Sequence, residues 1–259
     1  MKIYANGLDI RYEISGSGPW VTLSHSLTCD HTMWDQLAVS LAPTFSVLRY
    51  DTRGHGGTTA PEGAYSFAQL TADLIGLLDA LKIERTHFVG LSMGGMIGQH
   101  FALAQPARLN KLVIANSTSR IPPEAGPLWD ERIAIARAQG CAGVVEGTLA
   151  RWFTPGFRAA GADAVARIAT QIRNTPAAGY IGCASAIRAL DITAKIGTIA
   201  APTLVIAGAD DPGTPPAMSE VIASTIPGAR LEIIPSASHL SCIEQPEIFN
   251  RLVANFLKG

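Results

Sequence analysis

The sequence contains little charge, and the charge that it has is balanced. Only 16% of its 259 residues are Asp, Glu, Lys or Arg, and the formal net charge is -1. Lysine and arginine form no cluster, so we expect no nucleic-acid partner, because a phosphate backbone is bound by concentrated positive charge. No apolar run reaches the roughly 18 residues that a bilayer span requires. We therefore also expect no insertion into a membrane.

Cysteine is scarce too. The four cysteines are Cys29, Cys141, Cys183 and Cys242, and no two of them have the close spacing of metal ligands. Disulfide frameworks are typical of small secreted domains, so we expect free, buried thiols here. The first residues are polar and alternating, without the apolar stretch of a signal peptide. These features favour a cytoplasmic protein.

Hydrophobic residues are abundant, at 47% of the chain, which favours a large core. Short apolar runs alternate with amphipathic stretches of about 10–15 residues, which predicts an α/β fold with a mostly parallel sheet and helices on both faces. The expected strands are 2–4, 8–14, 20–24, 45–50, 86–89, 112–115, 203–207 and 231–234. The expected helices of this alternating part are 32–41, 67–81, 93–104, 216–225 and 246–257.

The alternation lapses over residues 119–199. This stretch is rich in alanine and has no strong strand signal, and its expected helices are 130–139, 143–153, 163–173 and 179–189. Because strands and helices alternate again after it, an insertion explains the lapse better than two successive domains. We predict a core formed by residues 1–118 and 200–259, with a helical cap formed by residues 119–199.

One short motif carries a chemical prediction. Gly90-Leu91-Ser92-Met93-Gly94 matches the pattern G-x-S-x-G and lies between an expected strand and an expected helix. This is the setting of the nucleophile elbow of the α/β-hydrolase fold, where a serine occupies a sharp turn. A purely structural turn is the alternative for the pattern taken alone. The motif makes Ser92 the candidate nucleophile.

A serine hydroxyl needs a base, and the base needs a carboxylate that orients it. In this fold the chain order is Ser, then Asp or Glu, then His. Asp211 and His239 each follow an expected strand, at the carboxyl edge where α/β sheets place their sites. Asp210 competes with Asp211, and we predict that Asp211 faces the histidine. A satisfied loop histidine is the alternative for His239.

Acyl transfer also needs two N–H donors for the oxyanion. One should be Met93 N–H, directly after the serine, and the other Leu27 N–H, in the loop after strand 20–24. We interpret His25 in that loop as a structural hydrogen-bonding residue rather than a catalyst. The loop 51–56 is interpreted as a brace for the elbow, with Arg53 at the site mouth as the alternative.

Several motifs occur together along the chain. They are Ser24-His25-Ser26-Leu27, Tyr50-Asp51-Thr52-Arg53-Gly54-His55-Gly56, Gly90-Leu91-Ser92-Met93-Gly94-Gly95, Arg151-Trp152-Phe153-Thr154-Pro155 and His239-Leu240-Ser241-Cys242-Ile243-Glu244. In this combination the chain resembles the 3-oxoadipate enol-lactonase group of α/β-hydrolases, over nearly its whole length. One position departs: the family pattern is Ser-Asn-Ser-Leu-Gly where this chain has Ser24-His25-Ser26-Leu27-Thr28. The departure leaves a related esterase or lactonase with another small substrate open.

The resemblance implies hydrolysis of 3-oxoadipate enol-lactone, a small anion, through an acyl-enzyme. It implies a triad of Ser92, Asp211 and His239, with Leu27 and Met93 as the oxyanion donors. No metal and no cofactor are expected.

The substrate's carboxylate calls for a cation. Arg151 is the first candidate, because it belongs to the cap motif and arginine binds carboxylates through two hydrogen bonds. Trp152 would form a wall of the pocket. A solvated arginine and an ordinary core tryptophan are the alternatives for these two residues. A non-catalytic binding module on the same fold is the alternative from another class, and the complete set of triad residues argues against it.

Overall fold

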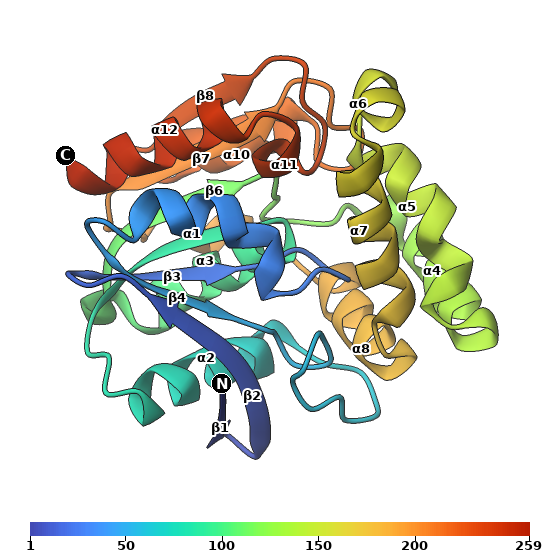
Figure 1. The fold of residues 1–259 in the computed structure, drawn as a ribbon, viewed down its shortest axis with the longest axis horizontal. Helices are drawn as coiled ribbons and strands as arrows, with labels where there is room; N and C mark the ends of the chain where they lie inside the picture. Colours follow the sequence, from blue (N-terminus) through green and yellow to red (C-terminus); the bar gives the residue numbers. More distant parts are fainter.

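A central eight-stranded sheet organises the chain, as seen in a computed structural model that describes all residues 1–259 (Figure 1). The strand order is β1-β2-β4-β3-β5-β6-β7-β8. β1 and β2 form an antiparallel hairpin and β2 is antiparallel to β4, whereas the remaining neighbours are parallel. The strands are β1 (Lys2–Ala5), β2 (Leu8–Ser15), β3 (Trp20–Ser24), β4 (Ser46–Tyr50), β5 (Thr86–Leu91), β6 (Leu109–Ala115), β7 (Thr203–Gly208) and β8 (Arg230–Ile234).

Helices cover both faces of this sheet. α1 and α12 pack together on one face, and α2, α3 and α10 cover the other (Figure 1). β5 and β7 are buried at every position, which explains why they read as continuous apolar runs in the sequence. The helices of this part are α1 (Asp35–Leu41), α2 (Phe67–Ala80), α3 (Met93–Ala104), α9 (Thr193–Ile196), α10 (Pro216–Thr225), α11 (Ser241–Glu244) and α12 (Pro246–Lys258).

The segment between β6 and β7 is helical, and its residues 123–188 form a separate layer at one end of the sheet (Figure 1, yellow-green to orange). Its main helices, which we call the cap helices, are α4 (Gly126–Gln139), α5 (Val145–Trp152), α6 (Pro155–Ala160), α7 (Ala162–Asn174) and α8 (Ala177–Arg188). No strand lies in this segment apart from one isolated bridge between Arg120 and Asp191. None of the helices in the molecule combines the length and apolar character that crossing a membrane needs.

The predicted architecture, a mostly parallel sheet covered on both faces, is confirmed, and each expected strand is present. The differences lie in short elements. The helix expected over 143–153 starts as a 3-10 turn at Cys141–Val144, and α6, α9 and α11 were not predicted. α6 depends on a local cap: Thr154 Oγ1 accepts the Phe157 N–H at 3.3 Å, and Pro155 occupies the first helical position. Six residues are too few to show a helical period.

Candidate active site

Ser92 lies in a strained turn between β5 and α3. Its backbone has φ 57° and ψ -117°, a conformation that is costly for a residue with a side chain. The flanking glycines are required sterically. A Cβ atom on Gly94 would lie 2.0 Å from the Ser24 carbonyl oxygen, and one on Gly90 would lie 2.2 Å from the Gly94 oxygen. The pattern G-x-S-x-G is thus what allows the serine turn to close against β3.

Asp211 and His239 are joined by a hydrogen bond. His239 Nδ1 and Asp211 Oδ2 are 2.8 Å apart, and both side chains are almost completely buried. The Thr214 hydroxyl donates to the same carboxylate at 2.7 Å. Burial alone would raise the pKa of Asp211, but His239 and Thr214 outweigh it and lower the pKa to about 2. Asp210, the competing acid, is exposed to solvent.

Asn116 is a further part of this arrangement that the sequence reasoning missed. It follows β6 directly, is fully buried and has a positive φ of 43°. Its amide donates to Asp211 Oδ2 at 3.1 Å and to the Ser238 carbonyl at 3.2 Å, while its oxygen accepts from the Ser241 hydroxyl at 2.6 Å. Its position at the carboxyl end of a parallel strand was the available signal.

Ser92 and His239 line one cavity of about 230 Å³ between the sheet edge and the cap helices. Leu27, Arg151 and Trp152 line the same cavity, so it brings together the predicted residues of core and cap. Ten of its twenty lining residues are hydrophobic, and none is Asp or Glu. The cavity suits a small, partly apolar molecule.

The predicted oxyanion donors are the backbone N–H groups of Met93, which directly follows Ser92, and of Leu27, which lines the same cavity. Met93 is the first residue of α3, where N–H groups have no acceptor within the helix. The Leu27 side of the cavity comes from the loop after β3, and the Leu27 N–H has no backbone acceptor. Neither N–H group is used in a backbone hydrogen bond, which is what the prediction of two oxyanion donors requires.

The motif Arg151–Pro155 is joined to the loop that carries His239. The Trp152 ring stacks on the His239 ring, with centroids 5.6 Å apart and planes at 28°. Leu240 N–H donates to the Trp152 carbonyl at 3.2 Å, and the Ser238 hydroxyl donates to the Arg151 carbonyl at 2.8 Å. Residues of α5 therefore contact the histidine and its loop as well as lining the cavity.

Glu244 also links the motif Arg151–Pro155 to the loop that carries His239. Its buried carboxylate accepts from the Thr154 N–H and the Thr154 hydroxyl, at 2.8 Å each, and from the Ser238 N–H. Thr154 belongs to the cap motif, whereas Ser238 precedes His239. One carboxylate thus fixes both segments relative to each other, a role that the sequence reasoning did not assign.

Two other predicted candidates lie away from the cavity. His25 is fully buried, and its ring bonds the Ser26 carbonyl at 2.7 Å and the Thr52 N–H at 2.9 Å. Burial lowers the pKa of His25, and its Nε2 accepts the Thr52 N–H, as only a neutral ring can. Arg53 pairs with the Asp73 carboxylate at 2.7 Å and lines no part of the cavity. Both side chains brace loops, and Arg53 is not at the site mouth.

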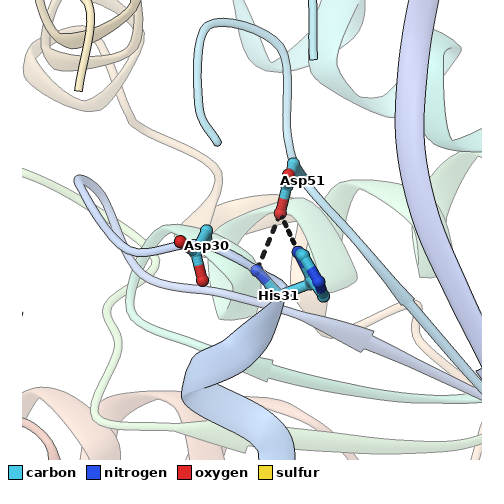
Figure 2. Close-up of side chains that lie close together, drawn as sticks. All are labelled: Asp30, His31 and Asp51. Carbon is cyan, nitrogen blue, oxygen red and sulfur yellow. Dashed lines mark hydrogen bonds and ion pairs between the residues drawn. The ribbon is translucent and has the colours of Figure 1, made fainter. Parts of the chain in front are cut away.

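A cluster of Asp30, His31 and Asp51 has the spacing of metal ligands, with potential ligand atoms within 4.8 Å of one another (Figure 2). Asp51 Oδ1, however, accepts hydrogen bonds from the backbone N–H and the ring of His31, at 2.8 and 2.7 Å. Asp30 Oδ1 accepts from the Thr32 N–H and from Gln171 Nε2. The protein itself uses these oxygens, and loop bracing accounts for the cluster.

The sheet order, the elbow turn and the buried acid–histidine pair define a class of protein, the α/β hydrolases. The family described as "alpha/beta hydrolase fold" matches residues 19–246. The chain belongs to this family and is a hydrolase.

Named relatives lie within the same family. 3-Oxoadipate enol-lactonase 2 of Acinetobacter baylyi is 36% identical over 240 residues, which cover 93% of this chain and 89% of the lactonase. The structure of the enol-lactonase from Burkholderia xenovorans LB400 is 38% identical, with a TM-score of 0.96 and full coverage of both chains. A thermophilic esterase from Thermogutta terrifontis, solved with malate bound, is 28% identical with a TM-score of 0.94, covering 100% of this chain and 97% of the esterase.

Proposed function

We propose that this enzyme hydrolyses a small lactone, 3-oxoadipate enol-lactone or a close analogue, through an acyl-enzyme on Ser92. The observation that carries the proposal is the meeting of Ser92 and the Asp211–His239 pair at one cavity. The similarity to two enol-lactonases, at 36% and 38% identity, supports the choice of substrate.

In the proposed mechanism, Ser92 Oγ attacks the lactone carbonyl while His239 takes the hydroxyl proton. Asp211 stays ionised, holds Nδ1 of His239 as the protonated nitrogen and stabilises the imidazolium that forms. The N–H groups of Leu27 and Met93 receive the oxyanion. Collapse opens the ring to an ester on Ser92, and His239 then deprotonates the water that releases the product.

The cap residues complete the proposal. Arg151 would bind the carboxylate of the anionic substrate, and Trp152 would form a wall of its pocket while stacking on His239. We propose that residues 119–199 act as a cap that shapes the substrate pocket, over a core of residues 1–118 and 200–259. A cytoplasmic location is part of the same proposal.

The second candidate is an esterase or lactonase for another small substrate. The departure at His25 favours it, because this residue lies in the loop that supplies the Leu27 donor. The likeness to a thermophilic esterase at 28% identity supports it as well. Both candidates use the same chemistry at Ser92 and differ in the acyl group.

The first prediction tests the chemistry. With p-nitrophenyl acetate, the wild type should release a burst of p-nitrophenol equal to the enzyme concentration, and Ser92→Ala should abolish it. We expect Ser92→Ala to lower kcat by roughly 10⁴- to 10⁶-fold, because the remaining groups act only together with the nucleophile. Ser224→Ala, an exposed serine on α10, is the matched control and should leave the burst unchanged. A burst that survives in Ser92→Ala would refute the assignment.

The substrate needs a separate measurement. We expect kcat/KM for 3-oxoadipate enol-lactone to exceed that for short, neutral p-nitrophenyl esters. The opposite preference, by several orders of magnitude, would end the lactonase proposal and favour the esterase.

A further inference from the structure

Two arginines, Arg132 and Arg151, line the cavity at Ser92, and no acidic residue does. Arg151 comes from α5, and Arg132 comes from the middle of α4, outside every motif of the sequence. Both are half-buried, and none of the twenty lining residues is acidic. The positive charge of the cavity is therefore not neutralised by its own walls.

Neither arginine has a charged partner in the protein. The one hydrogen bond of the Arg151 guanidinium runs to the Thr148 hydroxyl at 3.4 Å. Arg132 Nε is buried without an acceptor. Other shielded arginines of the chain are paired, as Arg53 is with Asp73 and Arg49 with Glu13. Shielding a cation from water without giving it a charged partner is unfavourable, and these two half-buried arginines at the cavity are the exception in this respect.

The surroundings of Arg132 and Arg151 disfavour their positive charge without removing it. Burial lowers the pKa of Arg132 and of Arg151, and the charge of Arg132 lowers that of Arg151 further. Tyr180 of α8 is the titratable neighbour that both share, while Glu131, next to Arg132, is exposed and forms no ion pair with it. Arginine keeps its proton in proteins, so an anion between the two groups would relieve their repulsion.

An aromatic ring restricts the orientation of the Arg132 guanidinium. The Arg132 guanidinium lies over the Trp129 ring, 5.0 Å from its centroid, and Trp129 also lines the cavity. Stacking on an aromatic face restricts the plane of the guanidinium and leaves its edge free for hydrogen bonds. A planar carboxylate matches that edge with two parallel hydrogen bonds.

We propose that Arg132 and Arg151 together form a carboxylate-binding subsite, which makes the enzyme selective for lactones and esters that carry a free carboxylate away from the scissile carbonyl. This inference rests on the proposed function and deepens it, because Arg132 becomes a specificity-determining residue beside Arg151. Thr148, which bonds Arg151, holds that side chain within the subsite.

Two esters of equal chain length test the proposal: the mono-p-nitrophenyl ester of glutarate, which is anionic, and p-nitrophenyl valerate, which is neutral. After subtraction of the uncatalysed rate, the wild type should prefer the glutarate ester. Arg132→Gln should lower kcat/KM for that ester by about 10- to 100-fold, mainly through KM, because it loses charge-assisted hydrogen bonds. For the valerate ester, kcat/KM should change by less than about twofold. For the glutarate ester, kcat/KM of Arg132→Lys should lie between the values of the wild type and Arg132→Gln.

Arg137→Gln, an exposed arginine on the same helix, is the matched control and should resemble the wild type for both esters. Equal losses on both esters in Arg132→Gln, or a wild type without preference for the anionic ester, would overturn the inference. The proposed function is tested by a different result: it would be refuted if the valerate ester gave no burst that depends on Ser92.

A measurement on the wild type alone guards against misfolded variants. Glutarate should inhibit valerate ester hydrolysis competitively, and the uncharged glutaramide should inhibit at least about tenfold more weakly, because it cannot neutralise the two guanidinium groups. Equal inhibition by the acid and the amide would count against the subsite.

Discussion

At the residue scale, the buried carboxylate of Asp211 has little freedom to move. Besides His239 it accepts hydrogen bonds from the Gly213 N–H at 2.8 Å, from the N–H and hydroxyl of Thr214, and from the Asn116 amide. Each of these donors favours the ionised form, which agrees with a pKa of about 2. The network holds the carboxylate plane toward His239 and keeps its negative charge at any pH at which the protein would work.

The neighbouring acids allow a matched test. Asp211→Asn should lower kcat by about 10³- to 10⁴-fold, because an amide neither stabilises the imidazolium nor selects the same ring tautomer. Asp210→Asn, one position away and exposed, should change kcat by less than about twofold, as expected for a surface substitution away from the site. Steady-state hydrolysis of p-nitrophenyl acetate measures both. Similar losses in the two variants would contradict the assignment of Asp211.

At the element scale, α8 is docked on the loop after β4 by direct backbone contact. A Cβ atom on Gly179 would lie 1.9 Å from the Gly54 carbonyl oxygen, and Gly54 has a positive φ of 79°. Close by, Tyr65 N–H donates to the Gly182 carbonyl at 3.1 Å. No side chain separates the cap helix from the core here, so its position depends on two glycines.

Gly179→Ala should therefore displace α8. The added methyl group meets backbone, which cannot rotate away, and we expect a loss of about 1–3 kcal/mol in the free energy of unfolding. The next residue, Tyr180, lines the cavity. Because the displacement would move this side chain too, kcat/KM should fall as well. Gly156→Ala in α6, where a Cβ atom meets nothing within 4 Å, is the control and should be neutral. Thermal unfolding that is unchanged in Gly179→Ala would refute this account of docking.

At the scale of the whole molecule, several histidines are buried without a cationic role. Burial lowers the pKa of His55 to about 3 and that of His87 to about 4. In the unfolded chain both would titrate near their ordinary value of 6.5. Below that pH the unfolded state binds protons that the folded state does not, so their contribution to stability is complete above about pH 6.5 and falls as the pH is lowered.

The chain should therefore lose stability from about pH 6.5 down to about pH 4, at roughly 1.4 kcal/mol per pH unit for each of these histidines. His87→Gln removes one of the two groups. Urea unfolding at pH 6, 5 and 4 gives the free energy of unfolding at each pH. Its decrease per pH unit should be smaller in the variant by the contribution of one histidine. Identical slopes in wild type and His87→Gln would show that His87 binds its proton as readily in the folded protein as in the unfolded chain, against the lowered pKa.

Local patterns in the sequence determined much of this protein. Inner strands such as β5 and β7 could be predicted because a strand buried on both faces is a continuous apolar run. The turn at Ser92 could be recognised because its steric demand is met by glycines two residues away on either side, and the acid and histidine because they follow strands in a known order. In each case the cause lies within a few consecutive residues.

Only the tertiary structure decided which side chains meet. Whether Asp210 or Asp211 faces His239 depends on how the loop after β7 folds against Thr214 and Asn116. The entry of Arg132 into the cavity depends on how α4 packs against α8. Such contacts join residues far apart in the chain, and they are fixed by packing and by the need to satisfy buried polar groups, which no local pattern records.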